Sequence, residues 1–357
     1  MSFPDHFGRI IYTRAQLDAF FDRISLPSEH RPWRDRADEN EILAAPNHNR
    51  DAATALAFLA TLQKYTVAAI PFESLALHYS SRHTISIDPA VVFHKIVQRR
   101  CGRGGYCMEN SCLFGTVLAS LGYDVYPTGA RVNEAVQPVA NSRDWKGPKF
   151  DGWNHMVNIV TIAGQKYFVD VGFGSSGPHH PIPLTAGYTS TIITQPVRLV
   201  REQIPDLRTT TAATLYPAFP SSSSTPPSVS SSSLDQHLWI YQYRHPPHGD
   251  WLPAYCFGET EFTPSDFAVM NHFTSTSPTS WFTYIVLCVK MIMDEGELVG
   301  DVTLVKSEIN RRIWGKSVTV AKCENEEQRI EALEEWFGIS LTAEEKNGIK
   351  GLPSELM

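Results

Sequence analysis

The 357-residue sequence predicts an α+β fold in which a helical region, an antiparallel sheet and a mixed α/β region follow one another along the chain. Three observations support this order. Residues 1 to about 100 carry apolar side chains at helical spacing, and residues 122–200 hold β-rich runs separated by Gly and Pro. The last third contains further strands and ends in an amphipathic helix.

The N-terminal region predicts a helical bundle. The stretch TRAQLDAFFDRI begins with Thr13, a residue type that caps helix N-termini, and its apolar residues recur at helical spacing. The Ala/Leu-rich stretch after Asp51 stops at Pro71, whose ring disfavours helix for the preceding residue. A further helix starts with Pro89 just inside it.

The middle of the chain predicts an antiparallel sheet or small barrel. Its strands are YDVYPTGARVN, HMVNIVTI and QKYFVDV. The low-complexity tract SSSSTPPSVSSSS (221–233) offers nothing to bury and predicts a disordered insertion.

Strands resume after this tract at LWIYQYR, WFTYIVLCVKM (281–291) and DVTLVKS, and ENEEQRIEALEEWFGI forms the final helix. We therefore expect four segments: a helical domain over 1–110, an antiparallel, β-barrel-like domain over 111–220, a disordered insertion over 221–235 and an α/β lid domain over 236–357.

Composition excludes several functional classes. The net charge is −7 and no Lys/Arg block occurs, which argues against a nucleic-acid partner. The most apolar window, 281–293, is too short to span a bilayer and contains Lys290, so we expect a buried strand and no membrane partner. The first residues lack the pattern of a secretory signal. The six cysteines are then expected to be free thiols in a cytoplasmic protein.

The stretch CGRGGYCMENSC (101–112) holds three of these cysteines. After it, apolar residues recur every four positions up to Gly122, which predicts a helix from about Cys107 to Leu121. Cys107 then lies in the first turn, where free backbone N–H groups and the helix dipole stabilise a thiolate. Gly104 and Gly105 permit a tight loop and close approach of a substrate.

Other interpretations of these cysteines remain open. Cys107 by itself is compatible with a structural cysteine, Cys112 lies a turn deeper as a core residue, and Cys101 has no helix end beside it. The intervals between the three thiols differ from the two-to-four-residue spacing of zinc sites, and no His–His pair lies nearby. We therefore expect no metal.

A base and an acid for the thiol are found in WNHMVNIVTIAGQKYFVDVGFG (153–174). A hairpin that turns at Ala163-Gly164 places Asp170 opposite Val157. His155 then faces the same side of the sheet as Asp170, diagonally across from it, and a shift of one residue would separate them. Taken singly, His155 is compatible with a structural strand histidine and Asp170 with a turn-capping carboxylate. Together with Cys107 they predict a thiol acyl-transfer site.

At this point the sequence resembles a known family. RGGYCMEN (103–110), WNHMVNIV (153–160) and YFVDVGFG (167–174) are similar to motifs of the arylamine N-acetyltransferases, as are IPFESLALHY (70–79) and MNHFTSTSPTSWF (270–282). The similarity extends over nearly the whole chain. It implies three domains around a cysteine-protease-like Cys-His-Asp core, and a ping-pong transfer of an acyl group from acyl-CoA to an arylamine or arylhydrazine. It implies no permanently bound cofactor.

The resemblance also implies residue roles. Cys107 is the nucleophile, His155 its base and Asp170 the orienting acid. Arg103 and Glu73 match a structural ion pair near the site, although a solvated surface pair would be worth little.

Further positions match the substrate cleft less specifically. Gly172, Phe173 and Gly174 match a loop that lines the cleft, and Phe72 matches a second wall of the amine pocket, although it is equally compatible with a core residue. Gly152 and Thr279 match positions that approach CoA.

Some points stay open at this stage. Residues 203–235 exceed the usual connection between the family's domains and resemble insertions of its eukaryotic microbial branch. Acetyl, propionyl and malonyl donors all fit. Two rival functions are a hydrolase or transglutaminase-like enzyme with the same triad and a non-catalytic paralogue that binds CoA or amines. The 48-residue interval between Cys107 and His155 disfavours a papain-type protease.

Overall fold

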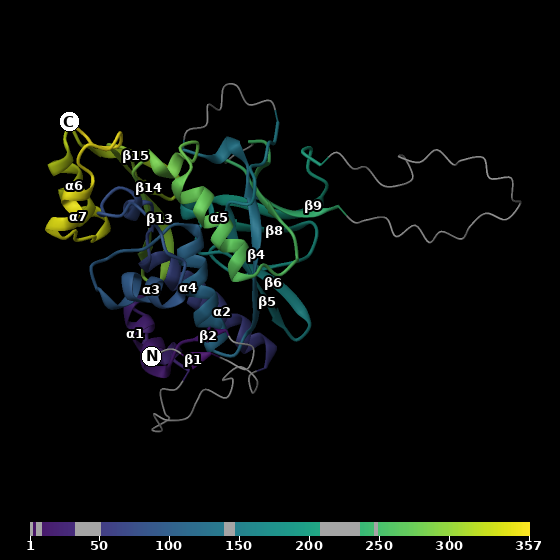
Figure 1. Cartoon of the computed structure of the whole chain (residues 1–357). Helices are drawn as coiled ribbons and strands as arrows, with labels where there is room; N and C mark the ends of the chain where they lie inside the picture. The colour runs from purple at the N-terminus through teal and green to yellow at the C-terminus, as the bar shows by residue number, and fades with distance from the viewer. Residues whose placement is uncertain (1–2, 5–8, 33–50, 139–146, 208–235, 246–248) are drawn as a thin grey trace, which may run out of the picture.

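The computed structural model describes residues 3–4, 9–32, 51–138, 147–207, 236–245 and 249–357 (Figure 1). The serine-rich tract that the sequence predicts to be disordered lies outside the described residues. A short pair of strands, β1 (Phe3–Pro4) and β2 (Ile10–Ile11), precedes the helices.

Four helices form the N-terminal region: α1 (Arg14–Arg23), α2 (Ala52–Ala69), α3 (Pro89–Phe93), which continues through a wider turn over His94–Gln98, and α4 (Cys107–Ser120). The predicted ends of these helices are confirmed. Thr13 caps α1, because its side chain and that of Gln16 each accept the other's backbone N–H. The helix α2 ends two residues before Pro71.

The middle of the molecule is an eight-stranded antiparallel sheet with the order β7-β6-β5-β4-β11-β10-β9-β8. One buried apolar cluster receives side chains from all eight strands, so the sheet has the interior of a nearly closed barrel. The strands are β4 (Asp124–Val132), β5 (His155–Ile162), β6 (Gln165–Val169), β7 (Ile182–Pro183), β8 (Tyr188–Ile192), β9 (Gln195–Glu202), β10 (Leu238–Tyr243) and β11 (Leu252–Phe257).

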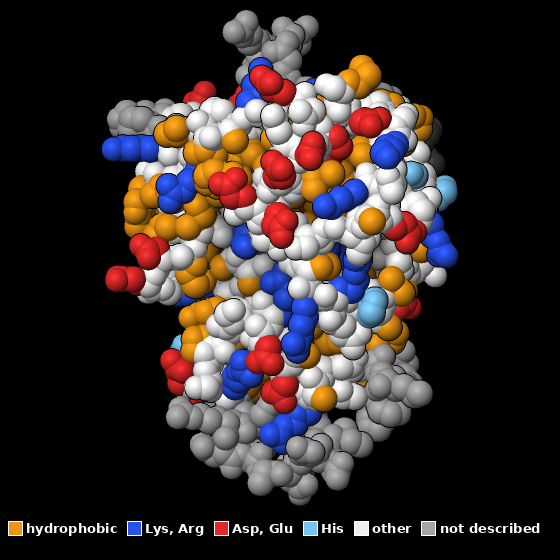
Figure 2. Space-filling model, turned by 90° about the vertical axis from the view of Figure 1, so that its left-hand side faces the viewer, with side chains coloured by type: hydrophobic (Ala, Val, Ile, Leu, Met, Phe, Trp, Pro, Cys, Tyr) orange, Lys and Arg blue, Asp and Glu red, His pale blue; other side chains and the backbone are white. Residues whose placement is uncertain are grey.

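A second sheet of five strands has the order β15-β14-β13-β12-β3. Beside it lie α6 and α7, where Figure 2 shows acidic side chains gathered on the surface. Leu333 and Phe337 of α6 pack in one cluster with Leu304 and Ile309 of the sheet. The elements are β3 (Phe72–Glu73), α5 (Pro264–Thr276), β12 (Leu287–Asp294), β13 (Glu297–Val305), β14 (Glu308–Ile313), β15 (Lys316–Lys322), α6 (Glu326–Phe337) and α7 (Ala343–Gly348).

Two expectations differ from the structure. The predicted strand over 281–293 begins only at Leu287, because Trp281–Thr283 form a helical turn. The segment boundaries also differ: α4 crosses residue 110, β10 and β11 join the middle sheet, and β3 forms the edge of the five-stranded sheet. Backbone pairing between distant segments decides these memberships, and composition along the chain does not reveal such pairing.

All six cysteines are free thiols, as predicted. Among the helices that the structure describes, none combines the length and apolarity needed to cross a lipid bilayer.

Candidate active site

The thiol of Cys107 lies at the start of α4, as the sequence predicts. One face of this helix is fully buried through Leu113 and Val117, which fixes the helix against the core. Glu109 accepts the N–H of Tyr106 over 3.2 Å and thereby closes the first turn. A Cβ on Gly104 would lie 1.9 Å from the carbonyl oxygen of Pro71, so only glycine allows the approach to the helix.

The hairpin of β5 and β6 has the predicted register. Ile162 pairs with Gln165, and Asn158 pairs with Val169, so the next pairs along place Asp170 opposite Val157. The turn residues Ala163 and Gly164 both have positive φ, as a tight two-residue hairpin requires. His155 therefore points to the same face as Asp170.

The structure brings the side chains of His155 and Asp170 together. His155 Nε2 lies 2.7 Å from Asp170 Oδ2, and Asp170 Oδ1 accepts the N–H of Gly172 over 2.7 Å. Both side chains are about 1% exposed. The rings of Phe173 and Tyr255 lie 5.3 Å and 4.9 Å from the imidazole, so water has little access to it.

Electrostatics favour a protonated imidazole. Burial by itself lowers the pKa of His155, but the carboxylate of Asp170 and then Cys107 outweigh it and raise that pKa to about 10. Because Nε2 bonds Asp170, Nδ1 is the ring nitrogen left to face Cys107. The thiol of Cys107 lies 3.5 Å from the carbonyl oxygen of Asn154. At neutral pH this arrangement favours an imidazolium at His155.

Cys107 and His155 open onto a cleft of about 270 Å³. Phe72 and the loop residues Gly172, Phe173 and Gly174 line it, as the resemblance implies. Gly172 is in close contact with the backbone of Cys107, since a Cβ there would lie 2.7 Å from Cys107 Cα.

Two aromatic residues of the cleft were missed as site residues. Trp281 stacks on Phe282 with ring centroids 3.7 Å apart, and both line the cleft. Trp281 and Phe282 are adjacent aromatic residues in the sequence, but the apolar run that begins with them predicts a buried strand. Gly152 and Thr279, by contrast, are exposed and do not line this cleft, so their contact with CoA stays a prediction.

A model of the family described as N-acetyltransferase matches residues 55–346 of the chain. The chain belongs to the arylamine N-acetyltransferase family. This member of the family is therefore an acyltransferase.

Several relatives of this acyltransferase match almost the whole chain. The N-malonyltransferase FDB2 of Gibberella moniliformis is 37% identical over 352 residues, which span 97% of this chain and 94% of that protein. The N-malonyltransferase FDB2 of Fusarium pseudograminearum is 39% identical over 345 residues, with 95% and 92% covered. The solved arylamine N-acetyltransferase of Mycobacterium marinum in complex with CoA has a similar fold, with a TM-score of 0.66 at 23% identity over 94% and 99% of the two chains.

A buried ion pair in this acyltransferase lies close to the start of the helix that carries Cys107. Arg103 Nε donates to Glu73 Oε1 over 2.9 Å, and both side chains are at most 2% exposed, so this is no solvated surface pair. Burial tends to raise the pKa of Glu73, but Arg103 and Lys95 lower it below its usual value. Glu345 of α7 adds a contact of 3.3 Å to Arg103. No sequence motif pointed to Lys95, and Glu345 reaches Arg103 from the other end of the chain.

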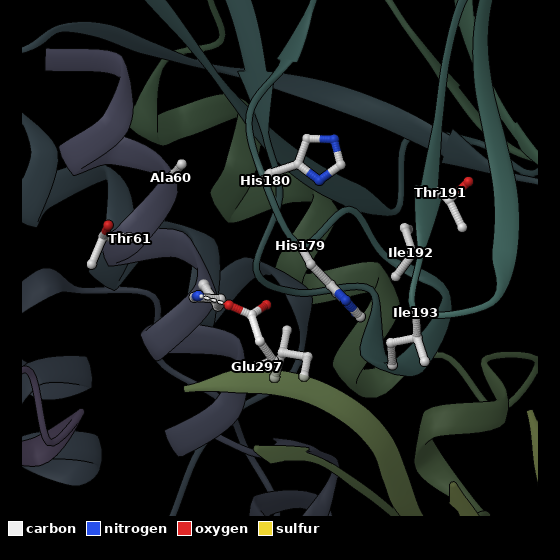
Figure 3. Close-up of a pocket in the computed structure, with 10 residues that line it drawn as sticks. Ala60, Thr61, His179, His180, Thr191, Ile192, Ile193 and Glu297 are labelled. Carbon is white, nitrogen blue, oxygen red and sulfur yellow. Dashed lines mark hydrogen bonds and ion pairs between the residues drawn. The ribbon is translucent and has the colours of Figure 1, made fainter. Parts of the chain in front are cut away.

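A second cavity of about 310 Å³ lies away from these residues, between α2 and the ends of β8 and β13 (Figure 3). Lys64 and Glu297 form a 3.1 Å ion pair at its wall, and His179 projects among the lining residues. Burial, His180 and Arg312 lower the pKa of His179 to about 3, so it is neutral. Among the described residues, no three His, Cys, Asp or Glu side chains are grouped to hold a metal ion.

Proposed function

We propose that this protein transfers a short acyl group from acyl-CoA to an arylamine or arylhydrazine through an acyl-cysteine at Cys107. The observation that carries the proposal is the 2.7 Å contact of His155 with Asp170 directly behind a thiol at a helix N-terminus. Membership of an acyltransferase family supports it. The cleft, walled by Phe72, Phe173 and Trp281, suits a flat aromatic acceptor.

In the first half-reaction the thiolate of Cys107 attacks the thioester carbonyl of acyl-CoA. The carbonyl oxygen becomes negative in the tetrahedral intermediate, and the backbone N–H groups at the start of α4 stabilise it. The C–S bond to CoA then breaks, and the imidazolium of His155 protonates the departing thiolate of CoA. The products are acyl-Cys107 and free CoA.

In the second half-reaction the amine attacks the carbonyl carbon of acyl-Cys107. Neutral His155 accepts the proton that the amine nitrogen loses as the new C–N bond forms. The C–S bond breaks, and the thiolate of Cys107 returns beside the imidazolium. Asp170 holds the orientation of the ring and stabilises its charge in both halves.

Among acetyl, propionyl and malonyl donors, we favour malonyl-CoA. The support is that two proteins 37% and 39% identical to this chain over nearly its whole length are named N-malonyltransferases. The described lining of the cleft includes Tyr243, whose hydroxyl group can donate a hydrogen bond to a carboxylate.

Intact-mass measurement with peptide mapping tests the proposal. We expect malonyl-CoA to acylate Cys107 faster than acetyl- or propionyl-CoA, and an added arylamine to remove the acyl group as an amide. Cys107→Ser should show no adduct. Cys112→Ser is the matched control, because burial raises the pKa of Cys112 to about 12 and its substitution should leave acylation unchanged. An adduct that persists in Cys107→Ser would exclude this nucleophile, and release by water as fast as by amine would favour a hydrolase.

A further inference from the structure

A single buried amide connects the two ends of the loop that carries Asp170. The side chain of Gln63, in α2, is fully buried, and its Nε2 donates to the carbonyl oxygens of Asp170, over 3.2 Å, and Pro178, over 2.9 Å. The loop 170–178 between these two carbonyls includes the residues of the cleft wall from Gly172 to Ser176. One donor group therefore fixes both ends of the loop.

The side-chain amide of Gln63 is energetically unfavourable in its apolar surroundings. Its Oε1 is buried and has no hydrogen-bond partner among the described residues. Its neighbours Leu59 and Leu62 on α2 are fully buried, and Val169 and Val171 belong to the same apolar cluster. An apolar side chain of the same shape would avoid the penalty of this unpaired acceptor, but it would leave the carbonyl oxygens of Asp170 and Pro178 without their donor. Packing alone thus does not account for a glutamine at this position.

The loop that Gln63 holds determines the geometry of the site. Asp170, the first residue of this loop, contacts His155, and Gly172 lies against the backbone of Cys107. Phe173 places its ring 5.3 Å from the imidazole. A small outward movement of this loop would lengthen the Asp170 contact and open the cleft wall at the same time.

The far end of the loop has polar links to two elements. The hydroxyl of Tyr241, in β10, donates to the carbonyl oxygen of Ser176 over 3.2 Å, and Gln63, in α2, donates to that of Pro178. Beyond Pro178 the chain continues to His179, which projects among the residues that line the second cavity (Figure 3). Among the described residues, Nε2 of His179 has no hydrogen-bond partner. The bond from Gln63 to the carbonyl of Pro178 therefore links α2 to this end of the loop.

We propose that Gln63 is a positioning residue for acyl transfer, which acts by holding loop 170–178 so that Asp170 and Gly172 stay in place around His155 and Cys107. The inference rests on the proposed function of Cys107. It adds a residue outside the sequence motifs of the site.

The test compares a variant without a donor with one that keeps it. Gln63→Met retains length and shape but cannot donate, so its acylation rate should fall about ten- to a hundredfold, as small misplacements of catalytic groups do. Its unfolding midpoint in urea should fall only modestly, because the carbonyl oxygens of Asp170 and Pro178 lose their donor while the unpaired Oε1 is also removed. Gln63→His carries a single N–H at nearly the same point, so it can bond one of the two carbonyl oxygens and should recover part of the rate. If Gln63→Met does not fold, Gln63→Leu supplies the same comparison.

A second measurement separates positioning from mere packing. NMR titration of His155 should show a lower pKa in Gln63→Met than in wild type, because a displaced Asp170 stabilises the imidazolium less. Thr66→Val is the matched control: Thr66 is buried on the same helix and its hydroxyl donates within that helix to the carbonyl of Leu62, so its substitution should change neither the acylation rate nor the pKa of His155.

The outcomes distinguish this inference from the proposed function. Gln63→Met with the wild-type acylation rate and His155 pKa would overturn the positioning role alone. Equal losses in the Met and His variants would also overturn it, because activity would then not follow the donor. Wild-type protein that acyl-CoA does not acylate at Cys107 would instead defeat the proposed function, while the NMR titration would still report on Gln63.

Discussion

Lys95 places its ammonium nitrogen 2.6 Å from Oε1 of Glu109, inside the first turn of the helix that begins at Cys107. The two side chains are only 15% and 3% exposed. The same nitrogen lies 4.0 Å from Oε1 of Glu73, whose closer partner is Arg103 at 2.9 Å, so two cations face these two buried carboxylates. Because the other oxygen of Glu109 accepts the N–H of Tyr106, the Lys95–Glu109 pair fixes the start of the helix that carries Cys107.

Removing this cation should destabilise the fold strongly. Lys95→Met leaves a buried carboxylate without its partner, which typically lowers the free energy of unfolding by about 3–5 kcal/mol. Urea denaturation measures the change. Lys64→Met is the matched control, since its partner Glu297 is 74% exposed and such pairs contribute about 0–1 kcal/mol. Adding Glu109→Gln to Lys95→Met should recover part of the loss; equal small losses in both lysine variants would show that the buried pair contributes little.

Gly172 should tolerate no side chain. In Gly172→Ala the new Cβ would lie 2.7 Å from Cα and 2.8 Å from the carbonyl oxygen of Cys107, and backbone atoms cannot yield as a flexible side chain can. The loop must move, so we expect acylation to fall about a hundredfold or more. Gly258→Ala is the control, because its nearest atoms are 3.9 Å away. Single-turnover acylation of both variants measures the effect, and a Gly172→Ala enzyme as fast as wild type would refute the close contact.

The parts of the site that sequence predicted correctly depend on local periodicity. Apolar residues every four positions located the helix from Cys107, and the alternation of strand faces around Ala163-Gly164 set the register of His155 and Asp170. The apolar spacing extends over a few helical turns, and the alternation of strand faces over one hairpin. Both patterns can therefore be recognised without knowing which distant segments lie nearby.

The parts that sequence missed depend on contacts between distant segments. Gln63 meets the loop of Asp170 across more than a hundred residues, and Glu345 reaches Arg103 from the other end of the chain. A single buried glutamine such as Gln63, or a glutamate on a short helix such as Glu345, produces no periodic pattern in the sequence. The apolar run from Trp281 was assigned to a strand because a short buried run looks the same in a strand and in a packed turn.

Trp281 should contribute to binding of the aromatic acceptor. Its ring stacks on Phe282 at 3.7 Å and lines the cleft. Trp281→Leu removes one aromatic face, and such contacts contribute about 0.5–1.5 kcal/mol, so KM for an arylamine should rise up to about tenfold. The rate of acylation by acyl-CoA in the absence of amine should change less than this KM does. Equal effects on both half-reactions would place Trp281 in the donor site or in the fold instead.

Asp170 should control the charge state of His155. The pKa of His155 is raised to about 10 in the folded protein, above its usual value of about 6.5. A histidine with a raised pKa stabilises the fold fully below about pH 6.5, and this contribution is lost as the pH rises through about 10. Asp170→Asn removes the main cause of the shift, so the pKa of His155 should fall and the imidazole should be neutral at lower pH.

Two measurements check this prediction against wild type. The free energy of unfolding should decline between pH 7 and about pH 10 in wild type more steeply than in Asp170→Asn, since the lysines and tyrosines common to both proteins cancel in the comparison. Acylation by Asp170→Asn at neutral pH should fall by roughly 10³–10⁴-fold, as in other triads that lose their acid. Parallel unfolding curves across this pH range would mean that His155 is not held as an imidazolium, and the thiolate of Cys107 would then need another source of stabilisation.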